Sequence, residues 1–269
     1  MYPRLFQIGH IIIPTYGAFI AVALVAALAS LPPLARRLGL DAGKLWNLGL
    51  IGILTALISA RLLVVAEFFS VFRQHPFWVI GLAANRAAPW IEPAAILLGI
   101  AATLLYILAE GLPFLRVLDC AAPAATLGLA ISSIGAFLSG AGYGLPSSHT
   151  WAVTYTRPFA YFWYLTPLGT RLYPVQLYQA IAFLIILAAL LWRLPHRHHD
   201  GELAGIWLFL AGLASSFIDL YRAFSPTHLV AHQAVCISMV LASAAFLLRR
   251  NSRFSIPSAY NVVDDPQHV

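Results

Sequence analysis

Residues 90–109 read WIEPAAILLGIAATLLYILA, a run of twenty residues in which Glu92 is the only charged side chain. An α-helix needs about 20 predominantly apolar residues to cross the hydrocarbon core of a bilayer. Further stretches of the chain have the same character, so we expect an all-α integral membrane protein with about seven transmembrane helices. The candidate spans are residues 14–34, 46–70, 90–109, 120–140, 174–192, 203–221 and 229–248.

The composition of the chain leads to the same fold class. Hydrophobic residues make up 61% of the 269 residues, charged residues only 10%, and the mean hydropathy is +0.81. A soluble domain carries about 25% charged residues, so this chain must be solvated by lipid. The isoelectric point near 9.6 does not indicate nucleic-acid binding, because the basic residues are scattered around the expected helix ends. Cys120 and Cys236 show no metal or disulfide spacing and are expected to be small core residues.

The distribution of Lys and Arg predicts the orientation in the membrane. The connections on one side, with the C-terminal tail, carry nine of these residues, the other side carries six, and Arg61 lies within a span. The positive-inside rule then places the N-terminus outside and the C-terminus in the cytoplasm. Residues 1–250 are expected to form one membrane domain with a loop-rich outer cap at 143–173. Within this cap, 152–155 is either a short strand or an interfacial segment. Residues 251–269 are expected to be a loose cytoplasmic tail.

Polar groups within the expected spans are candidate functional residues, because they are costly in lipid unless they pair or line a cavity. Arg61 lies deep in the second span. It could form a structural ion pair, snorkel to the membrane surface, or serve as a cation that faces a lipid phosphate. Asp219 and Arg222 are three residues apart and share a helix face, for which a local salt bridge is the simpler interpretation. Ser215 joins that face one turn earlier, and serines in membrane helices commonly mark close packing.

Glu92 and the histidines are weaker candidates. Glu92 stands at the start of its span, where a carboxylate can simply complement the helix dipole. His228 and His232 are four residues apart near the outer surface, but the sequence shows no third ligand, so no metal site is expected. His149 follows two serines in the cap, and sequence proximity does not make a catalytic triad.

Several short segments occur in a characteristic order along the chain. They are FQIGHIIIPTYGAF at 6–19, Arg61 after a small residue, DCAAP at 119–123, GAF at 135–137, Gly140, GLP at 144–146, YPVQLYQ at 173–179, DLYR at 219–222, and His232-Gln233 with Ser238. In order and spacing these segments resemble the prolipoprotein diacylglyceryl transferase family over about residues 6–245. No single motif is decisive, but the shared order and spacing of the motifs identify the resemblance.

The resemblance implies a reaction and its location. Enzymes of that family take the diacylglyceryl group from phosphatidylglycerol, form a thioether with the lipobox cysteine of a prelipoprotein and release glycerol phosphate. The resemblance therefore implies a multi-pass protein of the bacterial cytoplasmic (inner) membrane, with no metal or organic cofactor. Its expected partners are a phosphatidylglycerol-like phospholipid and a lipoprotein or another periplasmic-side acceptor, and we expect a monomer. The chemistry requires cations for the leaving phosphate and a means of deprotonating the thiol.

Much of the polar centre of the family is replaced in this chain. Serines stand at the positions of two arginines, and the asparagines, a glutamate and a histidine are also lost. The replaced positions are Ser133 and Ser215 for the arginines, Ala136 and Ser139 for the asparagines, Ala141 for the glutamate and the region of Pro93 for the histidine. Arginine to serine removes a bidentate phosphate clamp.

The preferred hypothesis is a divergent phospholipid-group transferase. Arg61 and Arg222 would hold the phosphate, and Tyr16, Gln176 and Tyr178 would position the lipid. Further substrate-binding candidates are Ser133, Ser139, Ser215 and Gln233, and the candidate bases are Glu92, Asp219, His149, His228 and His232. A non-catalytic relative that binds or presents a lipid or lipoprotein is the alternative. A transporter is a third hypothesis, which no inverted repeat or broken helix pair supports.

Overall fold

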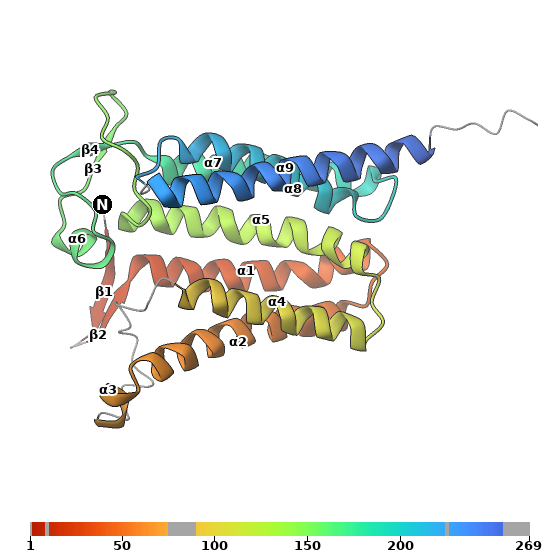
Figure 1. The fold of residues 1–269 in the computed structure, drawn as a ribbon, viewed down its shortest axis with the longest axis horizontal. Coiled ribbons are helices and arrows are strands. Elements are labelled where there is room, and N and C mark those ends of the chain that lie inside the picture. Colours follow the sequence, from red (N-terminus) through yellow and green to blue (C-terminus); the bar gives the residue numbers. More distant parts are fainter. Residues whose placement is uncertain (1, 9–10, 75–89, 224–225, 255–269) are drawn as a thin grey trace, which may run out of the picture.

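The computed structural model describes residues 2–8, 11–74, 90–223 and 226–254 of the chain (Figure 1). Within these residues seven helices are long and apolar enough to cross a membrane. They are α1 (Thr15–Arg37), α2 (Ala42–Glu67), α4 (Ile91–Ala109), α5 (Phe114–Ser139), α7 (Val175–Arg193), α8 (Glu202–Asp219) and α9 (Pro226–Phe254). The sequence prediction of an all-α membrane fold with seven spans is confirmed. Because α9 continues to Phe254, the expected tail is helical at its start, and residues 255–269 lie outside the described residues.

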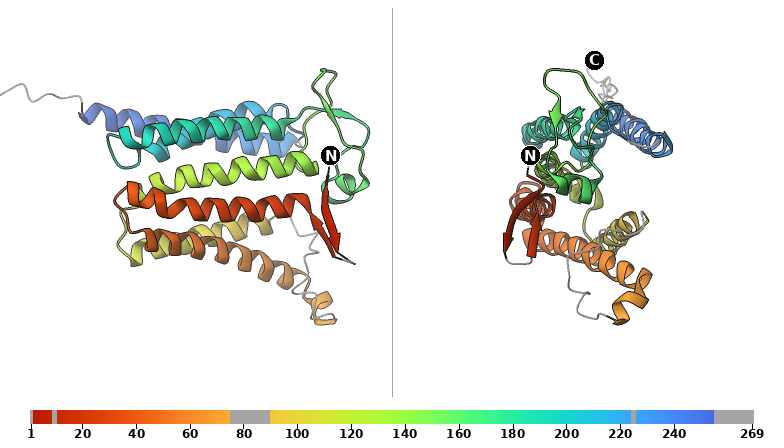
Figure 2. Two further views of the ribbon diagram at one scale, coloured as in Figure 1. Left: turned by 180° about the vertical axis from the view of Figure 1, so that it is seen from behind. Right: turned by 90° about the vertical axis from the view of Figure 1, so that its left-hand side faces the viewer.

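Helix α5 lies at the centre of the bundle, between α1 on one side and α7 and α8 on the other (Figures 1 and 2). The pair of α2 and α4 packs beyond α1, and α9 packs on α8. Glycines allow the closest approaches, since a Cβ at Gly135 of α5 would lie 2.2 Å from the Cβ of Phe19 on α1. A Cβ at Gly99 of α4 would lie 2.9 Å from the Cβ of Ala56 on α2. Small residues of this kind let membrane helices pack backbone against backbone.

Two short antiparallel strand pairs accompany the helices at one end of the bundle. Strand β1 (Arg4–Ile8) pairs with β2 (Ile11–Pro14), and β3 (Val153–Thr154) pairs with β4 (Arg171–Leu172). Of the two interpretations left open for 152–155, the structure shows the short strand. The β1–β2 pair was not predicted, because the first span was expected to begin at residue 14 and no element was assigned to the residues before it. Proline disfavours helical backbone in the residue before it, and α1 accordingly begins only after Pro14.

The cap at 143–173 is seated on the C-terminal end of α5. It contains α6 (Pro158–Tyr164) and a small core of Tyr155, Ala160 and Leu172. The Tyr155 hydroxyl donates to the carbonyl oxygen of Phe137 at 2.8 Å, and burial raises the pKa of Tyr155, so this donor stays protonated. The Thr166 hydroxyl donates to the carbonyl oxygen of Gly140 at 2.9 Å. These bonds join the cap to the helix that carries the altered family signature.

The opposite end of the bundle is held by a charged network around Asp119 of α5. Its carboxylate accepts hydrogen bonds from the backbone N–H groups of Gly201, at 2.7 Å, and Ala204, at 3.0 Å, which lie at the start of α8. The side chain is fully buried. Nearby, Arg116 pairs with Asp200 at 2.9 Å, and this hydrogen bond holds the pKa of the Asp200 carboxyl below its usual range. The aspartate of the DCAAP segment thus caps a helix through tertiary contacts.

Two other short helices complete the described elements. Helix α3 (Phe69–Gln74) follows α2, and a single 3₁₀ turn (Leu194–His196) follows α7. The cap, the N-terminal strands and the end of α8 gather at one end of the bundle, and α9 ends at the other (Figure 1). The residues of the candidate site come mainly from the end with the cap.

Candidate functional site

A cavity of about 200 Å³ lies at the end of the bundle that carries the cap. It is lined by Tyr16 of α1, by Leu129, Ser132, Ser133 and Ala136 of α5, by Ala141 and Gly142 after α5, by Gln176 and Gln179 of α7, and by Arg222 after α8. The structure thus brings together Tyr16, Ser133, Gln176 and Arg222, which the sequence placed in one site. Their separation along the chain shows that the bundle itself builds this cavity.

Arg222 is the one cation among the described residues that line the cavity. Its Nη2 donates to Oε1 of Gln179 at 2.7 Å, and its Nε lies 3.4 Å from Oδ1 of Asp219. Burial lowers the pKa of Arg222, while the charge of Asp219 opposes this effect. An arginine starts from a pKa above 12, so the guanidinium remains a positioned positive charge at neutral pH. Gln179 was missed as a site residue, although its YPVQLYQ segment was recognised.

The other polar groups of the cavity are tied to the backbone around it. Nε2 of Gln176 donates to the carbonyl oxygen of Ala141 at 2.9 Å and so fixes the turn after α5 against α7. The ring of Tyr16 meets that of Tyr164 edge to face, with centroids 6.0 Å apart. The Ser133 hydroxyl donates to its own helix, at the carbonyl oxygen of Leu129. The serine at the arginine position therefore adds no charge to the cavity.

Ser139 has a local role at the end of α5. Its hydroxyl donates to the carbonyl oxygen of Ala136 at 3.1 Å and accepts from the backbone N–H of Ala141 at 3.3 Å. The side chain is fully buried. It thus satisfies backbone groups where the helix ends, and it does not line the cavity of Arg222.

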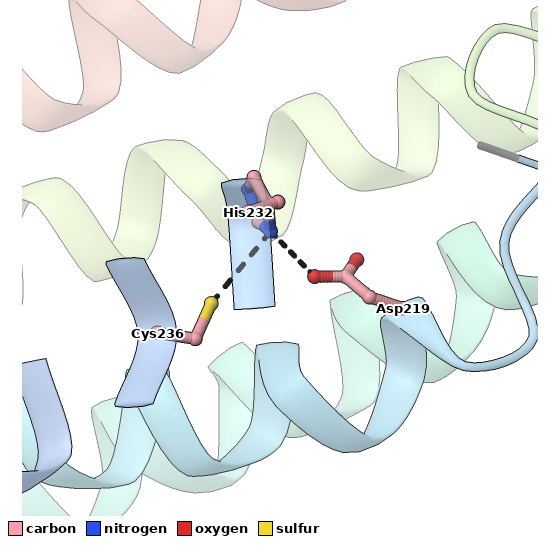
Figure 3. Close-up of side chains that lie close together, drawn as sticks. All are labelled: Asp219, His232 and Cys236. Atoms are coloured by element: carbon pink, nitrogen blue, oxygen red, sulfur yellow. Dashed lines mark hydrogen bonds and ion pairs between the residues drawn. The ribbon is translucent and has the colours of Figure 1, made fainter. Parts of the chain in front are cut away.

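A cluster of Asp219, His232 and Cys236 lies next to Arg222, between α8 and α9 (Figure 3). Nδ1 of His232 is 2.6 Å from Oδ2 of Asp219 and 3.6 Å from Sγ of Cys236. Asp219 and Cys236 are buried, whereas the side chain of His232 is about half exposed. Sequence reasoning assigned Cys236 to the core, although its spacing of four residues from His232 places both on one helix face.

The two helices that carry this cluster are joined by a pair of polar side chains. The Ser216 hydroxyl donates to Oε1 of Gln233 at 2.6 Å, and Nε2 of Gln233 donates back to the carbonyl oxygen of Ser216 at 2.8 Å. Gln233, predicted to bind substrate, is thus engaged in fixing α9 against α8. This contact sets the position of His232, its neighbour in the sequence.

Two predicted site residues lie among aromatic rings of the cap. The ring of His149 stacks on that of Trp151, with centroids 4.5 Å apart and planes 6° from parallel. Nε1 of Trp151 donates to the hydroxyl oxygen of Tyr178 at 2.9 Å. Neither His149 nor Tyr178 lines the cavity of Arg222. Tyr and Trp side chains of this kind are enriched at membrane–water interfaces.

The remaining candidates are not brought to the cavity. The guanidinium of Arg61 on α2 lies over the ring of Phe72, 5.4 Å from its centroid. Glu92 lies in the first turn of α4, and Ser215 lies one turn before Asp219 on α8. None of the three lines the described cavity, so a joint role of Arg61 and Arg222 at one phosphate stays a prediction.

A second, apolar cavity of about 390 Å³ lies between α1, α2, α4 and α5. Leu, Ile, Ala and Gly residues line it, with Thr103 as the one hydroxyl among its described lining residues. Gly49, Gly52 and Gly99 contribute to its walls. A space of this character suits a hydrocarbon chain rather than a headgroup.

These features define a multi-pass membrane protein with a cationic polar cavity at one end of its helices. The profile of the prolipoprotein diacylglyceryl transferase family matches residues 3–249. The chain is 25% identical over 223 residues to a phosphatidylglycerol–prolipoprotein diacylglyceryl transferase of Clostridium tetani, covering 82% of this chain and 86% of the relative. The chain is also similar to enzymes with the same name from two other organisms. The one from Prochlorococcus marinus is 30% identical, with 82% of this chain and 78% of the relative covered. The one from Synechocystis is 28% identical, with 93% of this chain and 91% of the relative covered.

The chain belongs to the prolipoprotein diacylglyceryl transferase family. This membership confirms the resemblance that the sequence segments indicated. It supports a membrane transferase, and the non-catalytic relative and the transporter considered as alternatives are not favoured.

Proposed function

We propose that the protein transfers a diacylglyceryl group from a phosphatidylglycerol-like phospholipid to the thiol of a lipoprotein acceptor. The observation that carries this proposal is the partly buried cation Arg222 in a cavity built by the segments that place the chain in its family. Relatives named phosphatidylglycerol–prolipoprotein diacylglyceryl transferases support the choice of donor and acceptor.

The donor headgroup is placed in the cavity of Arg222. The guanidinium, held by Gln179 and Asp219, is a charged, forked donor of the kind that binds phosphate oxygens. Tyr16 lies across the cavity as a hydroxyl that can bind the glycerol part. The apolar cavity between α1, α2, α4 and α5 supplies a place for an acyl chain that leaves the bilayer.

The transfer needs one bond to form and one to break. The acceptor sulfur, as thiolate, attacks the glyceryl carbon that bears the phosphate, a C–S bond forms, and the C–O bond breaks with its electron pair on the phosphate oxygen. Glycerol phosphate leaves, and the proton lost by the thiol balances the charge released. Arg222 stabilises the negative charge that develops on the leaving oxygens, as a donor fixed before the reaction. Activation of the thiol is placed at the adjacent cluster of Asp219, His232 and Cys236.

The orientation that fits this function has the N-terminus and the cavity on the outer face of the inner membrane. In the sequence, nine of the Lys and Arg residues fall in the connections predicted for the cytoplasmic side or in the tail, against six in the segments predicted for the outer side. This bias supports a cytoplasmic C-terminus. A reporter that works only in the cytoplasm should be active at Val269 and silent within 143–173, and the reverse pattern would contradict the orientation.

The proposed function is tested with the full chain in detergent, mixed with a lipobox peptide and vesicles of one donor lipid at a time. Mass spectrometry should find a diacylglyceryl adduct on the peptide with phosphatidylglycerol, and much less with phosphatidylcholine. A peptide with serine in place of its cysteine is the matched control and should stay unmodified. If no donor lipid yields an adduct, the proposed function is wrong.

A further inference from the structure

We propose that Asp219, His232 and Cys236 bind a zinc ion with an open fourth position, and that the acceptor thiol binds there as a thiolate. This inference rests on the proposed function and names how its second substrate is activated. The sequence alone predicted no metal, because its histidine pair lacked a third ligand. The fold supplies two ligands from outside that pair (Figure 3).

The donor set has the chemistry of a zinc site. A carboxylate oxygen, an imidazole nitrogen and a thiolate sulfur are the three ligand types that zinc takes in proteins, and sites with three protein ligands keep one position for substrate. The three ligand atoms lie within 4.8 Å of one another. Two helices hold them, with Asp219 at the end of α8 and the other two one turn apart on α9.

The distances agree with a metal-free form of such a site. Zinc bonds of about 2.0–2.3 Å in a tetrahedral geometry separate neighbouring ligand atoms by about 3.3–3.6 Å. The 3.6 Å between Nδ1 of His232 and Sγ of Cys236 already meets this requirement. The 2.6 Å between the same nitrogen and Oδ2 of Asp219 is a direct contact, which must open by about 0.7 Å when a metal enters.

Burial of Asp219 gives a second reason to expect a cation at the cluster. The residue is 2% exposed, and its Oδ2 accepts no hydrogen bond of ordinary geometry from the described residues, although it touches the imidazole of His232. Its other oxygen, Oδ1, already pairs with Arg222, and a metal at the cluster would give Oδ2 a ligand bond of its own, as suits a buried carboxylate. The half-exposed side of His232 leaves the cluster accessible, as an open coordination position requires.

The cluster lies where a thiolate would be useful. Oδ1 of Asp219 is 3.4 Å from Nε of Arg222, so one carboxylate separates the zinc cluster from the cation of the phosphate cavity. Zinc removes the proton of a coordinated thiol outright, and the proton passes to solvent or to the departing phosphate. The chain thereby activates the thiol without the polar groups that its family carries on α4 and α5.

The experiment measures the metal in the full chain, purified in detergent without chelators. Elemental analysis should find stoichiometric zinc, and the variants Cys236→Ser and Asp219→Asn should lose most of it. Cys120→Ser is the matched control, because Cys120 is a buried cysteine of α5 that contacts the carbonyl oxygen of Leu31 instead. The thermal unfolding of each variant shows whether it is folded.

Substitution of cobalt for zinc provides a readout that does not depend on activity. The cobalt protein should show a thiolate charge-transfer band that Cys236→Ser lacks, and the band should change when a lipobox peptide is added but not with its serine analogue. Absence of zinc, or equal zinc in Cys236→Ser and Cys120→Ser, would overturn the inference. Diacylglyceryl transfer that persists in the metal-free protein overturns the zinc site alone. Stoichiometric zinc and a peptide-dependent band without transfer from any donor lipid would instead remove the proposed function.

Discussion

Replacement of Arg222 by glutamine is expected to slow transfer by about a hundred- to a thousandfold. A donor that is fixed in place before the reaction stabilises a transition state by about 2.7–4 kcal/mol. Arg222 is the one cation among the described residues of the cavity lining, so no neighbour there can replace its charge. Glutamine keeps a polar side chain but removes the charge and the forked donors that reach Gln179 and Asp219.

The same substitution also affects stability, and the two effects must be separated. Asp219 is buried and loses one partner, and removal of one member of a buried ion pair costs about 3–5 kcal/mol. The contact of Asp219 with His232 reduces this cost. Arg222→Lys retains the charge while losing the two-sided hydrogen bonding, so its rate is expected to lie between those of the parent protein and Arg222→Gln.

Initial rates of adduct formation and thermal unfolding are measured on the same detergent samples. Arg73→Ala is the matched control, since Arg73 is an exposed arginine on α3 and does not line the cavity. The control should keep the parent rate. A folded Arg222→Gln protein that transfers the lipid within about threefold of the parent rate would refute the electrostatic role, which requires at least about a hundredfold loss.

Three further outcomes are expected. Asp119→Asn should destabilise the protein to thermal unfolding by about 3 kcal/mol, because hydrogen bonds to a buried charge are each worth about 1.5–3 kcal/mol, and an unchanged unfolding temperature would contradict this. The hydrogen bond from Arg116 lowers the pKa of Asp200. The ionised Asp200 therefore stabilises the folded protein at pH values above the unfolded-state pKa of about 4, and this stabilisation is lost as the pH falls through the lower folded-state pKa. Asp200→Asn should reduce this acid-side loss of stability in unfolding scans. Since Ser133 and Ser215 stand where the family has arginines, the chain should support growth poorly when it replaces the resident transferase of a dependent bacterium, and robust growth with normally lipidated lipoproteins would show that those arginines do not matter.

Parts of the site followed from the sequence because family segments mark them. Tyr16, Gln176 and Arg222 lie in such segments, and all three line one cavity. Gln179 lies in a recognised segment as well, yet its role depends on the guanidinium that donates to it across two helices. A hydrogen-bond partner that lies 43 residues away cannot be found from local spacing.

The sequence also led to interpretations that the tertiary structure changes. Cys236 was assigned to the core from its apolar surroundings, and it is indeed buried, but His232 lies 3.6 Å from its sulfur. The histidine pair at 228 and 232 was judged to lack a third ligand, and the structure groups His232 instead with Asp219 of α8 and Cys236 of α9. Ligand sets of this kind depend on which faces of two helices meet.

By itself, the sequence determined that the chain is a bundle of seven membrane helices of a known family. Both conclusions can be read along the chain. Bilayer thickness sets the length of each apolar run, and the family segments keep their order and spacing in the sequence. Only the tertiary structure decided which polar groups meet. Packing of α8 against α9 brings Asp219 to His232 and Cys236, and packing of α7 beside α8 brings Gln179 to Arg222. The physical reason is that helix rotation and register are set by contacts along whole faces, which no single segment encodes.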